Sequence, residues 1–205
     1  PPPLAWDVPP GFLDEDLVVH GKHRVVASNW RVGVENGFDS THIFIHKDSV
    51  LIEEASLALP LGLQPLGRHA FRTETADGAP KGVYDNFGPG EVAPVFTASI
   101  EGQEVLTGAV HGTNIVPHNI SIWLPGVLRV QPWPIPELTQ YEWYVPIDGS
   151  HHLYLQTLGR RCANEAERAQ WATDFATRWR DKALDGFNDD DVWAREATEP
   201  FYADD

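Results

Sequence analysis

His42 and His46 stand four residues apart, a spacing that places two side chains on the same face of a helical turn. Two neutral imidazoles on one face can bind a single metal ion, although the same spacing also occurs in helices that hold no metal. A zinc-protease helix carries Glu directly after its first His, and Ile43 occupies that position here. The pair therefore predicts a metal site of another kind, which needs a further ligand from elsewhere in the chain.

Two acidic segments could complete such a site. Asp39 lies three residues before His42, where it could cap a helix or accept the imidazole N–H and so set the tautomer of the ring. The run Asp189–Asp191 is typical of the charged first turn of a helix, and it is also the best source of a carboxylate ligand. Two His and one carboxylate leave coordination positions open on one side, as in non-haem Fe(II) centres that activate O₂.

The segments around these residues indicate an α+β fold. Residues 18–34 are rich in β-branched side chains and are expected to form strands. A turn at 35–39 and a short helix at 40–46 should follow. Between residues 49 and 157, short β-type runs alternate with Gly, Pro, Asp and Asn, beginning with residues 50–52. This spacing predicts a large antiparallel sheet built from hairpins.

The pattern changes to helical after residue 162. Residues 164–167 (Asn-Glu-Ala-Glu) resemble a capping box with Asn in the place of Ser or Thr. Three aromatic residues then recur at intervals of four, namely Trp171, Phe175 and Trp179. That stripe predicts a helix with one apolar face packed on the sheet. We expect this helix to end at Gly186 and a second helix to run from Asp189 to Ala197.

Length and charge exclude several classes of protein. The chain has 205 residues, 42% of them hydrophobic, which suits a single domain with a sizeable core. No apolar run approaches the ~20 residues of a membrane span, and no signal-peptide pattern occurs, so we expect a soluble, cytoplasmic protein. The 15 basic and 30 acidic residues give a net charge of −15, which disfavours binding to nucleic acids or anionic membranes.

The cysteine content limits the metal chemistry further. Cys162 is the single cysteine, so neither an internal disulfide nor a Cys-based zinc site can form. An iron–sulfur cluster needs at least two cysteines, even in its Rieske form. We expect Cys162 to be a partly buried thiol. Five prolines among the first ten residues predict an extended linker at residues 1–12 that arrives from an N-terminal domain, followed by a catalytic domain at residues 13–205.

The pattern Glu35-Asn36-x-x-Asp39-x-x-His42-x-x-x-His46 resembles the iron-ligand motif of the Rieske non-haem iron oxygenase α subunits. In that family the third ligand is an Asp five residues before a Glu, as Asp191 is before Glu196. The resemblance implies a mononuclear Fe(II) bound by His42, His46 and Asp191. It also implies a helix-grip-like catalytic domain, in which a curved antiparallel sheet surrounds a long C-terminal helix.

The resemblance carries expectations about cofactors and partners as well. The family has a [2Fe–2S] Rieske cluster in an N-terminal domain, and the Cys-x-His and Cys-x-x-His ligands of that cluster are absent from these 205 residues. Electrons reach it from NADH through a reductase and a ferredoxin. Family members are homotrimers in which the cluster of one subunit serves the iron of its neighbour. Asp39 would then bridge the two centres and orient His42.

The reaction implied is the cis-dihydroxylation of an aromatic ring with O₂, at an angular carbon beside a ring nitrogen. Gly37 would accept the substrate N–H through its backbone carbonyl, and Asn188 would lie beside the iron. The substrate-lining positions would be Ile120, Leu128, Val130, Trp133, Gln140 and Phe187. Trp133 stands where a Phe is expected, and a larger ring there would reshape the pocket. The apolar members of this set would equally suit an ordinary core.

Other functions remain open at this point. A related monooxygenase or aromatic O-demethylase on the same scaffold would have the same metal ligands. A non-catalytic helix-grip protein that binds an apolar ligand would have none, and it would leave the combination of Asn36, Asp39, His42, His46 and Asp191 without a reason. A structural zinc site normally has four closed ligands, which this set does not supply.

Overall fold

The computed structural model describes the backbone of residues 8–38, 42–46, 48–55, 59–62, 69–76, 79–87, 96–100, 103–111, 119–123 and 126–202. Its described side chains are those of residues 8–37, 42, 45–46, 48–52, 121–123 and 126–202. Asp39 and residues 1–7 of the predicted linker lie outside the described residues.

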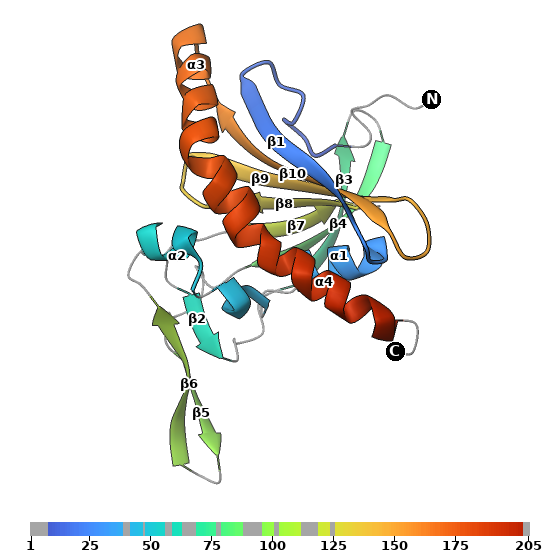
Figure 1. Cartoon of the computed structure of the whole chain (residues 1–205), viewed down its shortest axis with the longest axis vertical. Helices are drawn as coiled ribbons and strands as arrows, with labels where there is room; N and C mark the ends of the chain where they lie inside the picture. Colours follow the sequence, from blue (N-terminus) through green and yellow to red (C-terminus); the bar gives the residue numbers. More distant parts are fainter. Residues whose placement is uncertain are drawn as a thin grey trace.

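A seven-stranded antiparallel sheet forms the centre of the fold (Figure 1). Its strand order is β1-β10-β9-β8-β7-β4-β3. These strands are β1 (Leu17–Val26), β3 (His69–Ala76), β4 (Ala79–Phe87), β7 (Asn119–Trp123), β8 (Val127–Gln131), β9 (Leu138–Pro146) and β10 (His152–Arg161). A smaller antiparallel sheet has the order β2-β6-β5 and contains β2 (Leu59–Gly62), β5 (Phe96–Ile100) and β6 (Gln103–His111). The predicted antiparallel sheet and the α+β class are confirmed.

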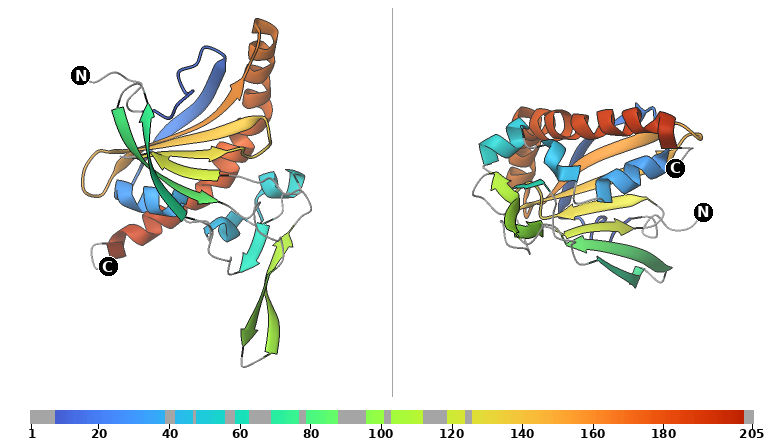
Figure 2. Two further views of the ribbon diagram at one scale, coloured as in Figure 1. Left: turned by 180° about the vertical axis from the view of Figure 1, so that it is seen from behind. Right: turned by 90° about the horizontal axis from the view of Figure 1, so that it is seen from below.

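A long helical run crosses one face of the larger sheet (Figure 2). It comprises α3 (Glu165–Asp174), a π-helical segment η4 (Phe175–Phe187) and α4 (Asn188–Tyr202). The predicted cap is confirmed, because the Asn164 side chain accepts from the Glu167 N–H at 3.0 Å. The aromatic stripe is buried as expected, with Trp171 0%, Phe175 8% and Trp179 3% exposed. Trp171 also donates its indole N–H to the Val18 carbonyl of β1 at 3.0 Å, which ties the helix to the sheet.

The predicted helix end at Gly186 is wrong, because the helical run continues through it. Gly186 does not adopt the positive φ of a helix-ending glycine. Leu184 and Phe187 on either side are 0% and 6% exposed. Packing of these side chains in the hydrophobic core stabilises the continuous helix more than the glycine destabilises it.

Two predicted strands are also wrong. Residues 50–52 belong to helix α2 (Val50–Ala55), in which Leu51 and Ile52 are buried and Val50 is exposed. A short apolar run does not distinguish a strand from a buried helical turn. Residues 30–34, expected as strand, belong to helix α1 (Trp30–Phe38).

Helix α1 forms because of its contacts with the sheet. The Asn29 side chain accepts from the Arg31 N–H at 3.0 Å and so caps the first turn. Gly33 and Gly37, four residues apart, both face Tyr144 so closely that a Cβ would collide with its ring at Gly33 and with its hydroxyl at Gly37. The two glycines therefore let α1 lie directly on β9, and the β-branched Val34 between them does not prevent the helix. The 3₁₀ helix η2 (His42–His46) follows, as the predicted short helix.

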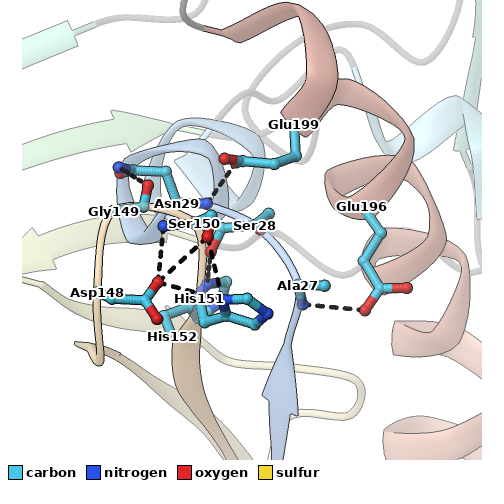
Figure 3. A network of polar contacts seen from close by, with 10 residues as sticks. All are labelled: Ala27, Ser28, Asn29, Asp148, Gly149, Ser150, His151, His152, Glu196 and Glu199. Carbon is cyan, nitrogen blue, oxygen red and sulfur yellow. Dashed lines mark hydrogen bonds and ion pairs between the residues drawn. The ribbon is translucent and has the colours of Figure 1, made fainter.

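A set of polar contacts joins α4 to the segment between β1 and α1 (Figure 3). Glu196 accepts from the Ala27 backbone N–H at 3.1 Å, and Glu199 accepts from the Asn29 backbone N–H. On the opposite side, the His152 imidazole bonds to the Ser28 carbonyl at 2.8 Å. The segment that leads into α1 is thus held between α4 and β10. Among the described residues, no helix has the length and apolar character needed to cross a membrane.

Candidate metal centre

His42, His46 and Asp191 come together from two distant segments of the chain. Each offers one ligand atom, and these atoms all lie within 4.8 Å of one another. The Oδ1 atom of Asp191 on α4 is 3.3 Å from Nε2 of His42 and 3.3 Å from Nε2 of His46, both on η2. The same carboxylate oxygen therefore faces both imidazoles. The three residues that the sequence predicts as metal ligands meet at one point.

The chemistry of this set fits a metal ion better than a set of hydrogen bonds. His46 is 0% exposed and Asp191 is 3% exposed. Among the described residues, neither ring nitrogen of His46 nor Oδ1 of Asp191 has a hydrogen-bond partner, and orphaned buried groups of this kind are costly. Ligands at about 2.0–2.2 Å from one ion lie about 3.0–3.4 Å apart. The two separations between Asp191 and the imidazoles, 3.3 Å each, match that spacing, so the residues fit a shared cation.

The electrostatics of Asp191 favour its ionised form. Burial works to raise its pKa, but the nearby imidazoles of His46 and His42 outweigh burial and hold the pKa of Asp191 well below its usual value. An ionised carboxylate is the form that binds a metal. Its two neighbours in the sequence lie differently: Asp190 is 3.6 Å from Nδ1 of His46 with a half-exposed side chain, and Asp189 pairs with Arg24 at 2.5 Å.

The ring planes of the two histidines are set by packing. The His46 ring stacks on Phe187 with centroids 3.8 Å apart and an interplanar angle of 20°. The His42 ring stands nearly perpendicular to that of His46, at 85° with centroids 5.5 Å apart. Since Phe187 is the last residue of η4 and immediately precedes α4, the same helical run both supplies the carboxylate and positions one imidazole.

A cavity opens beside these three side chains, between the sheet and the long helix. Its wall includes two of the metal-site residues, His42 and Asp191. The predicted substrate and catalytic positions that line it are Gly37, Leu128, Val130, Trp133, Gln140, Phe187 and Asn188. Ile120 pairs with Val130 across β7 and β8, but its side chain is outside the described set, as is all of Asp39. Every predicted pocket residue whose side chain is described therefore lines the cavity.

Two charged residues in the cavity wall are missing from the sequence prediction, Glu142 and Arg195. They are 2% and 1% exposed. Strand alternation could have indicated Glu142, because residues 140, 142 and 144 share the inner face of β9. Helical spacing could have indicated Arg195, which lies one turn beyond Asp191 on α4.

Glu142 and Arg195 belong to one buried polar network. Glu142 accepts hydrogen bonds from the side-chain amides of Gln140 and Asn188 and from the Tyr144 hydroxyl. The Arg195 guanidinium lies over the ring of Tyr154, 4.5 Å from its centroid.

Burial and the nearby Glu142 carboxylate raise the pKa of both Tyr144 and Tyr154. The two hydroxyls therefore stay protonated, and Tyr144 donates to Glu142. For Arg195, burial works to lower the pKa, but the nearby phenol oxygens of Tyr154 and Tyr144 and the carboxylates of Asp191 and Glu142 outweigh it and raise the pKa. The wall beside the metal site thus holds a carboxylate, a guanidinium and two neutral phenols.

Comparison with known proteins gives a consistent result over the whole chain. The chain is 53% identical over 208 residues to the terminal oxygenase component of carbazole 1,9a-dioxygenase from Metapseudomonas resinovorans, and 53% identical over 206 residues to that from a Sphingomonas species. Each match covers 100% of this chain and 54% of the relative. The chain therefore spans about half the length of these curated relatives.

Solved structures agree in fold. An oxygenase–ferredoxin complex of carbazole 1,9a-dioxygenase matches with a TM-score of 0.85 at 51% identity, covering 100% of this chain and 53% of that one. The terminal oxygenase of a Novosphingobium carbazole 1,9a-dioxygenase matches with a TM-score of 0.83 at 52% identity, covering 100% and 55%. The family model described as "Homotrimeric ring hydroxylase" matches residues 1–205. With its sheet, long helix and His/Asp centre, the chain belongs to the homotrimeric ring hydroxylase family.

Proposed function

We propose that this chain is the catalytic region of a ring-hydroxylating dioxygenase, which adds both atoms of O₂ to carbazole or a similar heteroaromatic. The observation that carries the proposal is the meeting of His42, His46 and Asp191 around a single point beside a cavity. A facial set of two imidazoles and one carboxylate suits mononuclear Fe(II). The curated relatives are terminal oxygenases of carbazole 1,9a-dioxygenase.

The residues around the centre have separate tasks. His42, His46 and Asp191 would bind the iron and leave its remaining positions open toward the cavity. When bound, the iron supplies the O₂ chemistry, with electrons from outside this region. Leu128, Trp133 and Phe187 enclose the ring, exclude water and hold it beside the metal site.

The cavity suits a flat aromatic molecule with one polar group. Its wall combines apolar and aromatic side chains with a few buried polar ones, which is typical of small-molecule sites. Gly37 lies in the wall on α1, where its backbone carbonyl would accept a ring N–H. Asn188 would lie beside the iron. We further propose that Asp39 orients His42 and carries the electron path from a neighbouring subunit.

The remaining components follow from the relatives. One solved neighbour is a complex of oxygenase and ferredoxin, so we propose a ferredoxin and an NADH-dependent reductase as redox partners, and a homotrimer as the working assembly. The [2Fe–2S] Rieske cluster would be bound outside these residues, because Cys162 is their single cysteine and is a buried free thiol. Because the proposed reductase uses NADH, we also propose a cytoplasmic location.

The proposal is tested by metal analysis of the purified protein, followed by product analysis with carbazole, dibenzofuran and biphenyl in the presence of a complete redox chain. We expect about one mononuclear iron per chain and an angular cis-diol product from carbazole. His42→Ala should lose the iron and the product, whereas His151→Ala, at an exposed position of the β9–β10 turn, should keep both. Release of formaldehyde from methoxyarenes without any ring diol would instead assign an O-demethylase. Wild-type protein that binds no iron would refute the metal site.

A further inference from the structure

The ring of Phe187 belongs both to the cavity wall and to the surroundings of a predicted iron ligand. Phe187 lines the cavity together with His42 and Asp191, whereas the fully buried His46 is not part of the wall. The Phe187 ring is stacked on the His46 ring, with centroids 3.8 Å apart and an interplanar angle of 20°. A molecule in the cavity therefore contacts Phe187 directly and influences His46 through it.

The orientation of the His46 ring depends on packing. A metal-bound imidazole usually has its orientation fixed by a hydrogen bond from its other ring nitrogen to an acceptor. Among the described residues, neither ring nitrogen of His46 has a hydrogen-bond partner, and the Asp190 carboxylate is 3.6 Å from Nδ1, which is too far for a hydrogen bond. The stacked Phe187 ring therefore does for His46 what a hydrogen-bonded acceptor does in other metal sites.

Phe187 is itself held by its neighbours and by whatever fills the cavity. Its ring contacts Trp133, a second residue of the wall, with centroids 5.3 Å apart and an interplanar angle of 54°. A void leaves the atoms that line it without contacts on that side. A flat aromatic molecule in the cavity would supply these contacts and restrict the movement of the Phe187 ring. Filling the cavity should thereby also restrict the His46 ring.

We propose that Phe187 is a positioning residue, which couples occupancy of the cavity to metal affinity by holding the His46 ring toward Asp191. Nε2 of His46 is 3.3 Å from Oδ1 of Asp191, so a rotation of that ring would move one ligand atom away from the shared point. An aromatic ligand that restricts Phe187 therefore tightens metal binding, and by linkage the metal tightens ligand binding by the same factor. The inference rests on the proposed function, because it takes the cavity as the site of an aromatic ligand and the three residues as an iron site.

Phe187→Leu removes the flat ring and keeps an apolar side chain. The matched control is Phe175→Leu, the same change in the same helical segment η4. Phe175 is 8% exposed and Phe187 is 6% exposed. The Phe175 ring also stacks on a histidine, His20, with centroids 5.3 Å apart and an interplanar angle of 29°. The control therefore loses the same kind of contact, but to a histidine that is not a predicted metal ligand.

The test measures Fe(II) affinity with and without carbazole. Dissociation constants are obtained anaerobically by competition with a chromophoric chelator, without redox partners, so that no turnover occurs. Without carbazole, Phe187→Leu should bind Fe(II) about tenfold more weakly than wild type, as when an outer partner of a metal ligand is removed. Saturating carbazole should tighten Fe(II) binding about fivefold in wild type and in Phe175→Leu, and less than about twofold in Phe187→Leu.

Two further measurements separate positioning from a general loss of packing. Phe187→Tyr keeps the flat ring, so its Fe(II) affinity without carbazole should remain within about threefold of the wild-type value. The visible spectrum of the Co(II)-loaded protein reports the geometry around the metal. Addition of carbazole should change this spectrum in wild type and in Phe175→Leu, but not in Phe187→Leu.

The outcomes separate this inference from the proposed function. If carbazole tightens Fe(II) binding equally in wild type and Phe187→Leu, or in neither although both ligands bind, the inference is wrong. It is also wrong if Phe175→Leu loses as much Fe(II) affinity as Phe187→Leu. If wild-type protein binds no Fe(II) or no carbazole, the proposed function fails and takes the inference with it.

Two complications have their own measurements. Should Phe187→Leu bind no carbazole, its Fe(II) affinity in the absence of carbazole decides, and a wild-type value overturns the inference. Should Phe187→Leu not fold, Phe187→Met takes its place, because its flexible apolar side chain fills the position without a flat ring.

Discussion

The guanidinium of Arg195 on α4 donates a hydrogen bond from Nε to the side-chain oxygen of Asn36 on α1, at 2.8 Å. This bond joins the helix that carries Asp191 to the helix that precedes His42 and His46. The charged side chain of Arg195 lies in the interior, where the residue is 1% exposed. Arg195 therefore couples the position of the carboxylate to that of the two imidazoles.

Replacing Arg195 with Met should destabilise the protein strongly. The substitution removes the donor that bonds to the Asn36 side chain. It also removes the buried positive charge near the Glu142 carboxylate, and breaking a buried charge network of this kind costs about 3–5 kcal/mol. Urea unfolding followed by circular dichroism measures the change. Arg180→Met, at an exposed position of η4, is the control and should leave the unfolding midpoint nearly unchanged. Equal midpoints for the two variants would contradict the structural role of Arg195.

The neighbouring aspartates should differ sharply in their effect on iron. Asp191→Asn removes the buried oxygen that faces both imidazoles, so its iron affinity should fall by more than the roughly 10- to 100-fold loss seen when an outer partner is removed. Asp190→Asn changes a half-exposed side chain 3.6 Å from His46 and should retain most of the iron. Iron content after dialysis against a graded chelator gives both values. Loss of iron from Asp190→Asn alone would show that the ligand has been assigned to the wrong carboxylate.

Two tryptophans on the long helical run should differ in their contribution to stability. Trp171 is 0% exposed and bonds to the Val18 carbonyl, so Trp171→Ala should lower the free energy of unfolding by about 3–5 kcal/mol. Trp193 on α4 is 73% exposed, and Trp193→Ala should have little effect on folding. Thermal unfolding of the two variants beside wild type provides the comparison, and a midpoint for Trp171→Ala near that of wild type would be inconsistent with this packing.

The stability of the protein should depend on pH through His152. Burial lowers the pKa of this imidazole below 6.5, against the opposing effect of its bond to the Ser28 carbonyl. Below about pH 6.5 the unfolded chain therefore binds a proton at His152 more readily than the folded protein does, and stability falls as the pH decreases. Above that pH the side chain is neutral in both states and the contribution is constant.

His152→Asn keeps a donor for the Ser28 carbonyl but does not titrate, so the loss of stability between about pH 6.5 and pH 5 should be smaller than in wild type. Chemical unfolding at a series of pH values measures the slope. His23→Asn, at an exposed position of β1, is the matched control for the loss of an imidazole. Wild type and His152→Asn share every other histidine, so an identical slope in these two proteins would exclude His152 as a cause of the pH dependence.

Local sequence was sufficient for the elements whose signals agree with their packing. The cap at Asn164 and the stripe of Trp171, Phe175 and Trp179 predict the start and the buried face of the long helix. Alternation of inward and outward residues predicts strands such as β10, where residues 152, 154, 156 and 158 are buried. These elements were predictable because backbone geometry and the hydrophobic pattern favour the same conformation.

Elements decided by close contact with the sheet were not predictable in this way. β-branched residues around Gly33 indicate a strand, but these residues form a helix, in which Gly33 and Gly37 allow close approach to the Tyr144 side chain. The helix passes through Gly186 because Leu184 and Phe187 on either side of it are buried. In both places, packing against a surface formed by distant residues overrides a weak local preference.

For the site, the sequence by itself determined which side chains are available: two histidines one helical turn apart, a later Asp followed five residues on by Glu, and no second cysteine. Only the tertiary structure decided that Asp191 reaches both imidazoles, and that Glu142 and Arg195 lie buried beside them. The physical reason is that these residues are separated by most of the chain. Their distances depend on the packing of α1, η2 and α4 on the sheet, which no local pattern encodes.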